Sequence, residues 1–468
     1  KAAEQVEELI DAIGNVTLDS YDSITAARTA YDKLSDNAKT LVGNYETLTA
    51  AEEALAKAEA DVISNAIKAI DAIGKVTADS KDKIQNAKDA YSAVPERLRD
   101  KVTNSDTLDK ATERFAVIDT IKQAGTKSEE HFDTVLGTLA DNNIYPVQSI
   151  GGEWSVIALA RAGKLSADKA AKYYSELCEA VKANGSDRLS DRKPTENARV
   201  IIALSSLGKN SADIAGYNLL SGLDDMDYIT SQGINAVIFS LIAFDTTDYS
   251  AKTHDELITY IVDNMTGKGW ALAGNTADVD LTAMAIQALA PYAADEKVNA
   301  AIDSGLEFLA ESLDENARYA NGSESTSQVL IALAALGIDP LTDSRFIVDG
   351  ITLIDALESY ATENGYSHTL GGEENYMATE QAALALTAYE LSKDGSSLYE
   401  MSAKAEPTEP ENPDTPAQPG DSVKPGDCSG KPEDKNDPIN PGTGVLVTGG
   451  MAVLISGAVM LISKKKRK

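Results

Sequence analysis

The chain is poor in the residues that build metal and disulfide sites. It has only two cysteines, Cys178 and Cys428, and three scattered histidines among 468 residues. Two such cysteines do not make a disulfide framework or a zinc site, and the separated histidines argue against a histidine-based metal centre. We therefore expect neither a metal nor a cofactor.

Basic residues are scarce relative to acidic ones. Lys and Arg total 42 against 74 Asp and Glu, which gives a net charge of −32. A chain of this charge repels phosphate backbones, so nucleic acid is not an expected partner. The acidity favours solubility and keeps separate molecules apart on a crowded surface.

Six short, Ala-rich segments recur about 37 to 53 residues apart, which is the spacing of a helical repeat array. Each is apolar on nearly every side, as expected of a buried helix, and too short to span a bilayer. Charged amphipathic segments separate them, such as 167–183, 252–264, 295–313 and 346–362. The six apolar segments are 153–160, 196–204, 233–241, 277–289, 324–333 and 380–386.

Buried helices that alternate with exposed ones predict an (α/α)6 toroid over residues 128–401, in an all-α chain. In such a barrel the polar starts of the inner helices gather at one mouth. The side chains expected there are candidates for ligand binding: Glu153, Trp154, Glu196, Trp270, Asp278, Asp280, Glu324, Gln328, Tyr376 and Glu380.

The acidic residues of this mouth allow two interpretations. Asp280 would be a general acid tuned by Asp278 or by a Glu from a neighbouring helix, because close carboxylates can keep one of them protonated. Alternatively, Asp278, Glu196 and Glu324 cap helices and interact with their dipoles. We favour the second interpretation and commit to no catalytic residue. Both tryptophans follow glycine-containing loops, which predicts a flat aromatic face near the mouth for a sugar or corrin ring.

Several motifs of this region resemble the terpenoid cyclase and protein prenyltransferase superfamily. They are Gly-Glu-Trp at 152–154, Asp-Val-Asp-Leu-Thr-Ala at 278–283, Glu-Ser-Thr-Ser-Gln-Val at 324–329 and Met-Ala-Thr-Glu-Gln at 377–381. The resemblance implies an α/α toroid similar to those of cobalamin carriers. It would give Asp280 the place of the cyclase proton donor, but Leu281 replaces the acid that follows it. Few aromatic residues, no zinc-ligand set and no β-rich second domain further separate this chain from the enzymes and carriers.

Residues 1–61 and 62–124 form a duplication with a period of 60 residues. Ile10-Asp-Ala-Ile-Gly14 is matched by Ile70-Asp-Ala-Ile-Gly74, and Asn44 by Asn104. Register held across a whole period indicates repeated units, which we read as three helices each. Motifs such as Ala-Tyr-Asp-Lys-Leu at 30–34 resemble helical repeats of Gram-positive surface proteins, where a spacer or adhesive arm would be the role.

The end of the chain resembles a sortase cell-wall sorting signal. Residues 402–439 are Pro-rich and polar, which predicts a disordered, wall-spanning stalk. Asn440, Pro441, Gly442, Thr443 and Gly444 are followed by an uncharged run, 445–462, and a basic tail. Such a run is a candidate for a single transmembrane helix, with the basic end in the cytoplasm. The resemblance implies that a sortase joins Thr443 to peptidoglycan, although Asn440 departs from the usual Leu of the motif.

These features predict a protein of the cell wall and outer surface, anchored in the membrane before sortase cleavage over residues 440–468. We interpret its toroid as a non-catalytic module that binds a small molecule or glycan, with a corrinoid as the family's suggestion. An enzyme that uses the mouth carboxylates, either cyclase-like or glycan-active, and a purely structural adhesin are the alternatives.

Overall fold

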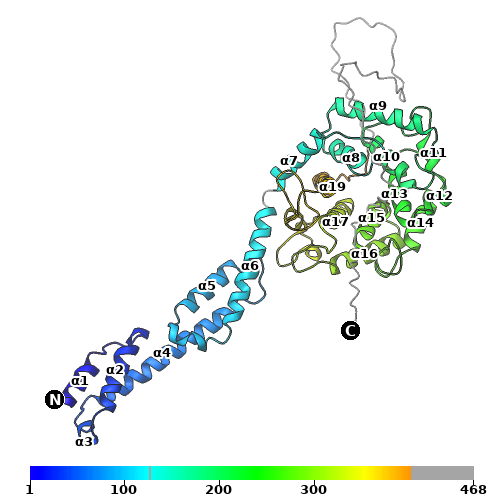
Figure 1. The fold of residues 1–468 in the computed structure, drawn as a ribbon. Helices are drawn as coiled ribbons and strands as arrows, with labels where there is room; N and C mark the ends of the chain where they lie inside the picture. The colour runs from blue at the N-terminus through cyan, green and yellow to red at the C-terminus, as the bar shows by residue number, and fades with distance from the viewer. Residues whose placement is uncertain (126–127, 402–468) are drawn as a thin grey trace, which may run out of the picture. The chain divides into compact units, whose positions relative to one another are not determined.

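The computed structural model describes residues 1–125 and 128–401 (Figure 1). The predicted all-α class is confirmed for this part of the chain, where only isolated β-bridges accompany the helices. None of its helices is both long and apolar enough to cross a membrane. The predicted stalk, sorting motif and membrane span (402–468) lie outside the described residues. The chain divides into two compact units, Lys1–Thr120 and a second that begins at Ile121.

The first unit contains two separate hydrophobic cores. Residues between Ala3 and Leu55 build one, and residues between Ala66 and Ala111 build the other. The helices are α1 (Ala2–Asp11), η1 (Leu18–Ser20), α2 (Tyr21–Asp32), α3 (Asp36–Lys39), α4 (Tyr45–Asp71), η2 (Ala78–Ser80), α5 (Lys81–Ser92), η3 (Glu96–Lys101) and α6 (Ser105–Gly125).

The 60-residue period reappears in the hydrogen bonds of this unit. The Asn44 side-chain amide donates to the Glu7 carbonyl at 3.0 Å and to the Asp11 carboxylate at 2.9 Å. Asn104 repeats both bonds 60 residues later, to the carbonyl of Ile67 at 3.0 Å and to Asp71 at 2.8 Å. Each asparagine thus ties the start of one helix to the end of another.

One helix belongs to both repeats. α4 supplies Leu48, Ala51 and Leu55 to the first core, and Ala66 and Ile70 to the second. The boundary between residues 61 and 62 therefore lies within an unbroken helix. Gly74 follows the end of α4 with φ = +63°, a left-handed conformation that favours glycine and redirects the chain.

Six helices of the second unit form a closed ring. Successive members pack against each other, and the last packs against the first (Figure 1). Their burial follows from sequence: in α13, for example, every residue from Ile234 to Phe244 is buried. We call this set the helical ring; it consists of α8 (Glu153–Arg161), α10 (Pro194–Ser206), α13 (Ile234–Asp245), α15 (Val279–Leu289), α17 (Ser323–Ala335) and α19 (Tyr376–Lys393).

The remaining helices of the second unit cover the outside of the ring (Figure 1). α16 is typical, because it turns one stripe of apolar residues inward, from Val298 to Leu309. In α9, Cys178 is buried in the core of the second unit. The covering helices are α7 (Ser128–Asp141), α9 (Ala167–Asn184), α11 (Leu219–Leu223), α12 (Met226–Thr230), α14 (His254–Asp263), η4 (Ala290–Tyr292), α16 (Glu296–Glu311), η5 (Ser344–Phe346) and α18 (Leu353–Glu358).

The segment 346–362 differs from the exposed amphipathic helix expected there. α18 is the only α-helix within it, and all six of its residues are buried. Its two acidic residues are compensated: Asp355 accepts from the backbone and hydroxyl of Thr352, and Glu358 accepts from the Tyr366 hydroxyl at 2.5 Å. Charge along the sequence therefore did not indicate exposure at this position.

Candidate functional site

The inner helices of the ring all run in the same direction. Hydrogen bonds join the first two turns of neighbours, as between Ser155 of α8 and Glu380 of α19, and between Glu153 of α8 and Arg199 of α10. Last turns meet at the opposite end, where those of α13, α15, α17 and α19 line one cavity. The predicted site residues near the helix starts therefore belong to one end, here called the N-terminal end of the ring.

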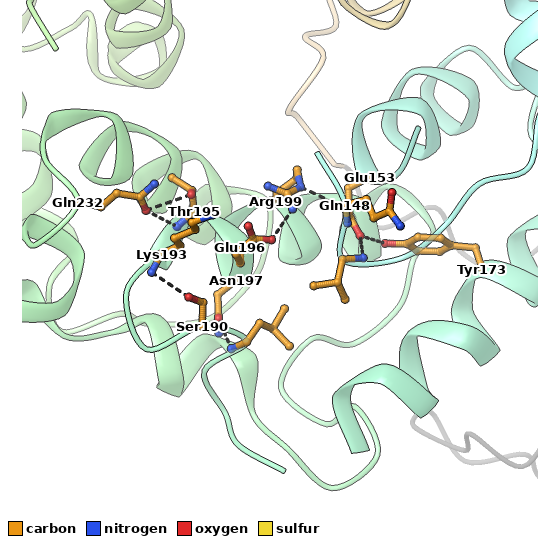
Figure 2. A network of polar contacts seen from close by, with 12 residues as sticks. Gln148, Glu153, Tyr173, Ser190, Lys193, Thr195, Glu196, Asn197, Arg199 and Gln232 are labelled. Carbon is orange, nitrogen blue, oxygen red and sulfur yellow. Dashed lines mark hydrogen bonds and ion pairs between the residues drawn. The ribbon is translucent and has the colours of Figure 1, made fainter. Parts of the chain in front are cut away.

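A buried ion pair dominates this end between α8 and α10 (Figure 2). Glu153 is 0% exposed, and its carboxylate accepts from Arg199 Nε at 2.9 Å and from the Tyr173 hydroxyl at 3.1 Å. It also accepts from the backbone N–H groups of Val147 and Gln148. Burial raises the pKa of Glu153, and the Arg199 guanidinium opposes that rise. All of these partners belong to the protein itself. The Glu153 carboxylate is therefore fixed inside the ring and is not accessible to a ligand from solvent.

Glu196 shares the same arginine. Its carboxylate accepts from Arg199 Nη2 at 2.5 Å, and its side chain is 20% exposed (Figure 2). The neighbouring Asn197 donates to the carbonyls of Asp187 and Leu219, which fixes the start of α10 against two loops. Glu196 is thus the solvent-facing member of a Glu–Arg–Glu group.

The two tryptophans pack in the interior. Trp270 is 0% exposed, and its indole N–H donates to the Ile261 carbonyl at 2.6 Å. Trp154 is 3% exposed and packs against the Phe239 ring, with 5.4 Å between centroids. Its indole N–H has no hydrogen-bond partner among the described residues. Neither indole presents the open aromatic face that the glycine-containing loops suggested, because both are buried among helices.

The two aspartates at the start of α15 have different surroundings. Asp278 is the N-cap, and its carboxylate accepts from the Leu281 backbone N–H at 3.0 Å. Asp280 lies inside the first turn and is 3% exposed. Asp278 therefore caps α15, as the second interpretation of the acidic residues predicted.

Glu324 and Gln328 lie on α17 and make different kinds of contact. One Glu324 oxygen lies 2.8 Å from His368 Nδ1 and accepts from the Ser323 hydroxyl at 3.2 Å. The other oxygen is buried without a hydrogen-bond partner among the described residues. Gln328 lies between two other amides: it accepts from Gln287 at 2.9 Å and donates to Gln381.

Glu380 and Tyr376 meet the start of α8. The Glu380 carboxylate accepts from the Gly151 backbone N–H at 3.0 Å and from the Ser155 hydroxyl. Burial raises its pKa to about 7, against the lowering effect of these bonds. The Tyr376 hydroxyl lies 3.4 Å from Ser155 Oγ. Glu380 is thus a buried carboxyl group that is fixed by α8 and has a raised pKa.

Sequence reasoning missed the partners that hold these carboxylates. Arg199 appeared only as one charge in an apolar segment, and Ser155 and His368 carried no motif at all. Within residues 1–125 and 128–401, no group of three or more His, Cys, Asp or Glu side chains is arranged to hold a metal ion. Comparison of the chain with family models, curated proteins and solved structures gave no match.

Proposed function

We propose that the chain is a cell-wall-anchored surface protein whose second unit is an (α/α)6 toroid that binds a ligand without transforming it. The observation that carries the proposal is the state of Glu324 at the N-terminal end of the ring. One of its oxygens is fixed by His368 and Ser323, while the other is buried without a partner in the described part of the chain. A buried acceptor of this kind is costly until a donor reaches it, and a ligand hydroxyl or amide supplies one.

The surroundings of the other carboxylates support binding over catalysis. Glu153, Glu324 and Glu380 each have a separate set of partners, so none of them shares a proton with another through a hydrogen bond. Each carboxylate is fixed by its own protein donors, which supports a scaffold for recognition. The ligand classes that fit are glycans and corrinoids, both rich in hydroxyl or amide donors.

The anchoring half of the proposal rests on residues 440–468. A sortase would cleave after Thr443 and join it to peptidoglycan, and until then the run 445–462 would hold the protein in the membrane. Thr443→Ala, expressed in a sortase-positive Gram-positive host, should move the protein from the fraction released by peptidoglycan hydrolase to the detergent fraction. Unchanged release by the hydrolase would contradict the assignment.

A second candidate is acid–base catalysis at Glu380. A pKa of about 7 is what a general acid or base needs near neutral pH, and Ser155 and Tyr376 lie beside the carboxyl. Turnover of any bound ligand that disappears in Glu380→Gln, with binding retained, would favour this candidate.

The test of ligand binding is a thermal-shift screen of the full chain against corrinoids, glycans, peptidoglycan fragments, isoprenoids and calcium. A ligand that binds only the folded state at a hundredfold excess over its dissociation constant adds about 2.7 kcal/mol of stability. We expect Glu324→Gln to abolish the shift and Glu296→Gln, an exposed glutamate on α16, to leave it unchanged. If no compound shifts the transition, the proposal of a ligand-binding toroid is not supported, and the purely structural adhesin becomes the favoured function.

A further inference from the structure

A cavity of about 510 Å³ lies at the opposite end of the ring, where the inner helices finish. The last turns of α13, α15, α17 and α19 line it, together with the segment 395–400 that follows α19. A volume of this size suits a small organic ligand. No motif of the sequence pointed to this end, since the candidate residues were chosen from helix starts and from the glycine-containing loops before the tryptophans.

The electrostatics of the cavity favour a cation. Four helices direct their C-terminal ends, which are the negative ends of their dipoles, toward it. Asp245, on the last turn of α13, and Glu400 add two carboxyl groups; His254 lies 2.9 Å from the first, and Arg161 interacts electrostatically with the second. None of the described residues that line the cavity is a lysine, arginine or histidine.

Asp245 is held in place with one oxygen still available. Its Oδ1 accepts from the Tyr292 hydroxyl at 2.6 Å and lies 2.9 Å from His254 Nε2. The Tyr292 hydroxyl and His254 Nε2 are themselves 2.9 Å apart. Oδ2 makes no hydrogen bond within the described residues, so the carboxylate is oriented by one oxygen and can accept through the other. These three residues come from α13, α14 and η4, which explains why no local sequence pattern revealed them.

A second acceptor points to the same ligand chemistry. Gln287 lines the cavity and is 3% exposed. Its amide N–H groups are used, because Nε2 donates to the Gln328 carbonyl and to Gln328 Oε1 at 3.0 and 2.9 Å. Its Oε1 is buried with no partner among the described residues. The cavity therefore offers acceptors and needs a ligand that donates.

The rest of the lining is apolar or aromatic. Ile242, Ile331 and Leu398 supply aliphatic surface, and Tyr292 and Tyr399 supply aromatic rings. Aromatic faces attract ammonium groups as well as apolar bodies. We propose that this cavity binds an organic ammonium ion, with the ammonium group at Asp245 and the apolar body against the aliphatic and aromatic wall.

The test is isothermal titration of the full chain with phenethylamine, 2-phenylethanol and phenylacetate, three probes of one shape and different charge. We expect binding of the ammonium, at least tenfold weaker binding of the alcohol and none of the carboxylate. If the alcohol binds as tightly as the amine, or if no probe binds at millimolar concentration, the proposal is wrong.

Variants then locate the site. Asp245→Asn should weaken phenethylamine binding at least tenfold. Asp255→Asn is the matched control, because Asp255 lies 3.4 Å from the other nitrogen of His254 but is fully exposed and does not line the cavity. Equal binding by the two variants would overturn the assignment. If Asp245→Asn does not fold, the comparison of amine with alcohol on the unaltered chain still decides. Glu324→Gln should leave amine binding unchanged, which separates this site from the N-terminal end.

Discussion

Removing Arg199 while leaving Glu153 in place should destabilise the helical ring strongly. In Arg199→Met, Glu153 stays fully buried and loses the only positive charge that its hydrogen bonds include. Breaking a buried ion pair by removing one partner costs about 3–5 kcal/mol, because the other charge is left uncompensated. For a unit of this size each kcal/mol lowers the transition temperature by about 2–4 °C, so a loss of about 6 °C or more is expected.

The pH dependence of the variant gives a second, independent readout. Burial already raises the Glu153 pKa above its ordinary 4.5, and the loss of Arg199 removes the main opposing charge. A carboxyl whose pKa is higher in the folded state binds its proton more tightly there, so stability falls as pH rises through that pKa. Arg199→Met should therefore regain stability on acidification from pH 8 toward pH 5, by more than the unaltered chain does.

Tryptophan fluorescence is the assay of choice, since Trp154 and Trp270 are the only tryptophans and both lie in the second unit. The double variant Glu153→Gln, Arg199→Met should recover most of the loss, because a neutral amide needs no counter-charge. A loss below about 1 kcal/mol in Arg199→Met, or no recovery in the double variant, would refute the reasoning that the guanidinium compensates a buried carboxylate.

Three further outcomes follow from contacts in the two units. The unaltered ring should lose about 3 kcal/mol of stability between pH 4 and pH 8, because the Glu380 pKa is about 7 in the folded state against 4.5 in the unfolded state. Glu380→Gln should abolish this pH dependence, which fluorescence melts across the same pH range measure. Asn104→Ala should lower the free energy of unfolding of the second core by about 1–2 kcal/mol, and Asn44→Ala should do the same for the first core, as measured by faster hydrogen exchange. Unequal effects would show that the repeats are not equivalent. Gly305→Ala should cost about 1–3 kcal/mol despite alanine's helix preference, because its methyl group would lie 3.0 Å from Ile286 Cδ1 and 3.1 Å from Trp270 Cζ3; a raised melting temperature would contradict this.

The sequence was sufficient for the features that depend on local pattern. The long apolar segment of α13 predicts a helix buried on all sides, and the structure places it there. The matched Asn44 and Asn104 predict equivalent local structure, and their hydrogen bonds are equivalent. Periodicity and repetition are properties of the chain itself, so they can be read without knowing what packs where.

Prediction from sequence was weaker wherever the outcome depended on a distant partner. Segment 346–362 carries charges typical of a surface helix, yet Asp355 and Glu358 are buried because Thr352 and Tyr366 reach them. Trp270 follows a glycine-containing loop, but the Ile261 carbonyl and the surrounding helices enclose it. Asp245, His254 and Tyr292 are brought together only by the ring. Such contacts are tertiary, and no single segment contains the information that determines them.

The shared helix of the two repeats has a mechanical consequence. α4 is 27 residues long, which corresponds to about 40 Å of helix, and it supplies side chains to both cores. When the chain is pulled, we expect the continuous helix to couple the two cores, because unwinding that starts in the part of α4 that packs in one core can propagate along the helix into the part that packs in the other. The duplication should therefore yield to force in a single step rather than as two sequential events. Single-molecule extension would record one length increment where two independent domains would give two.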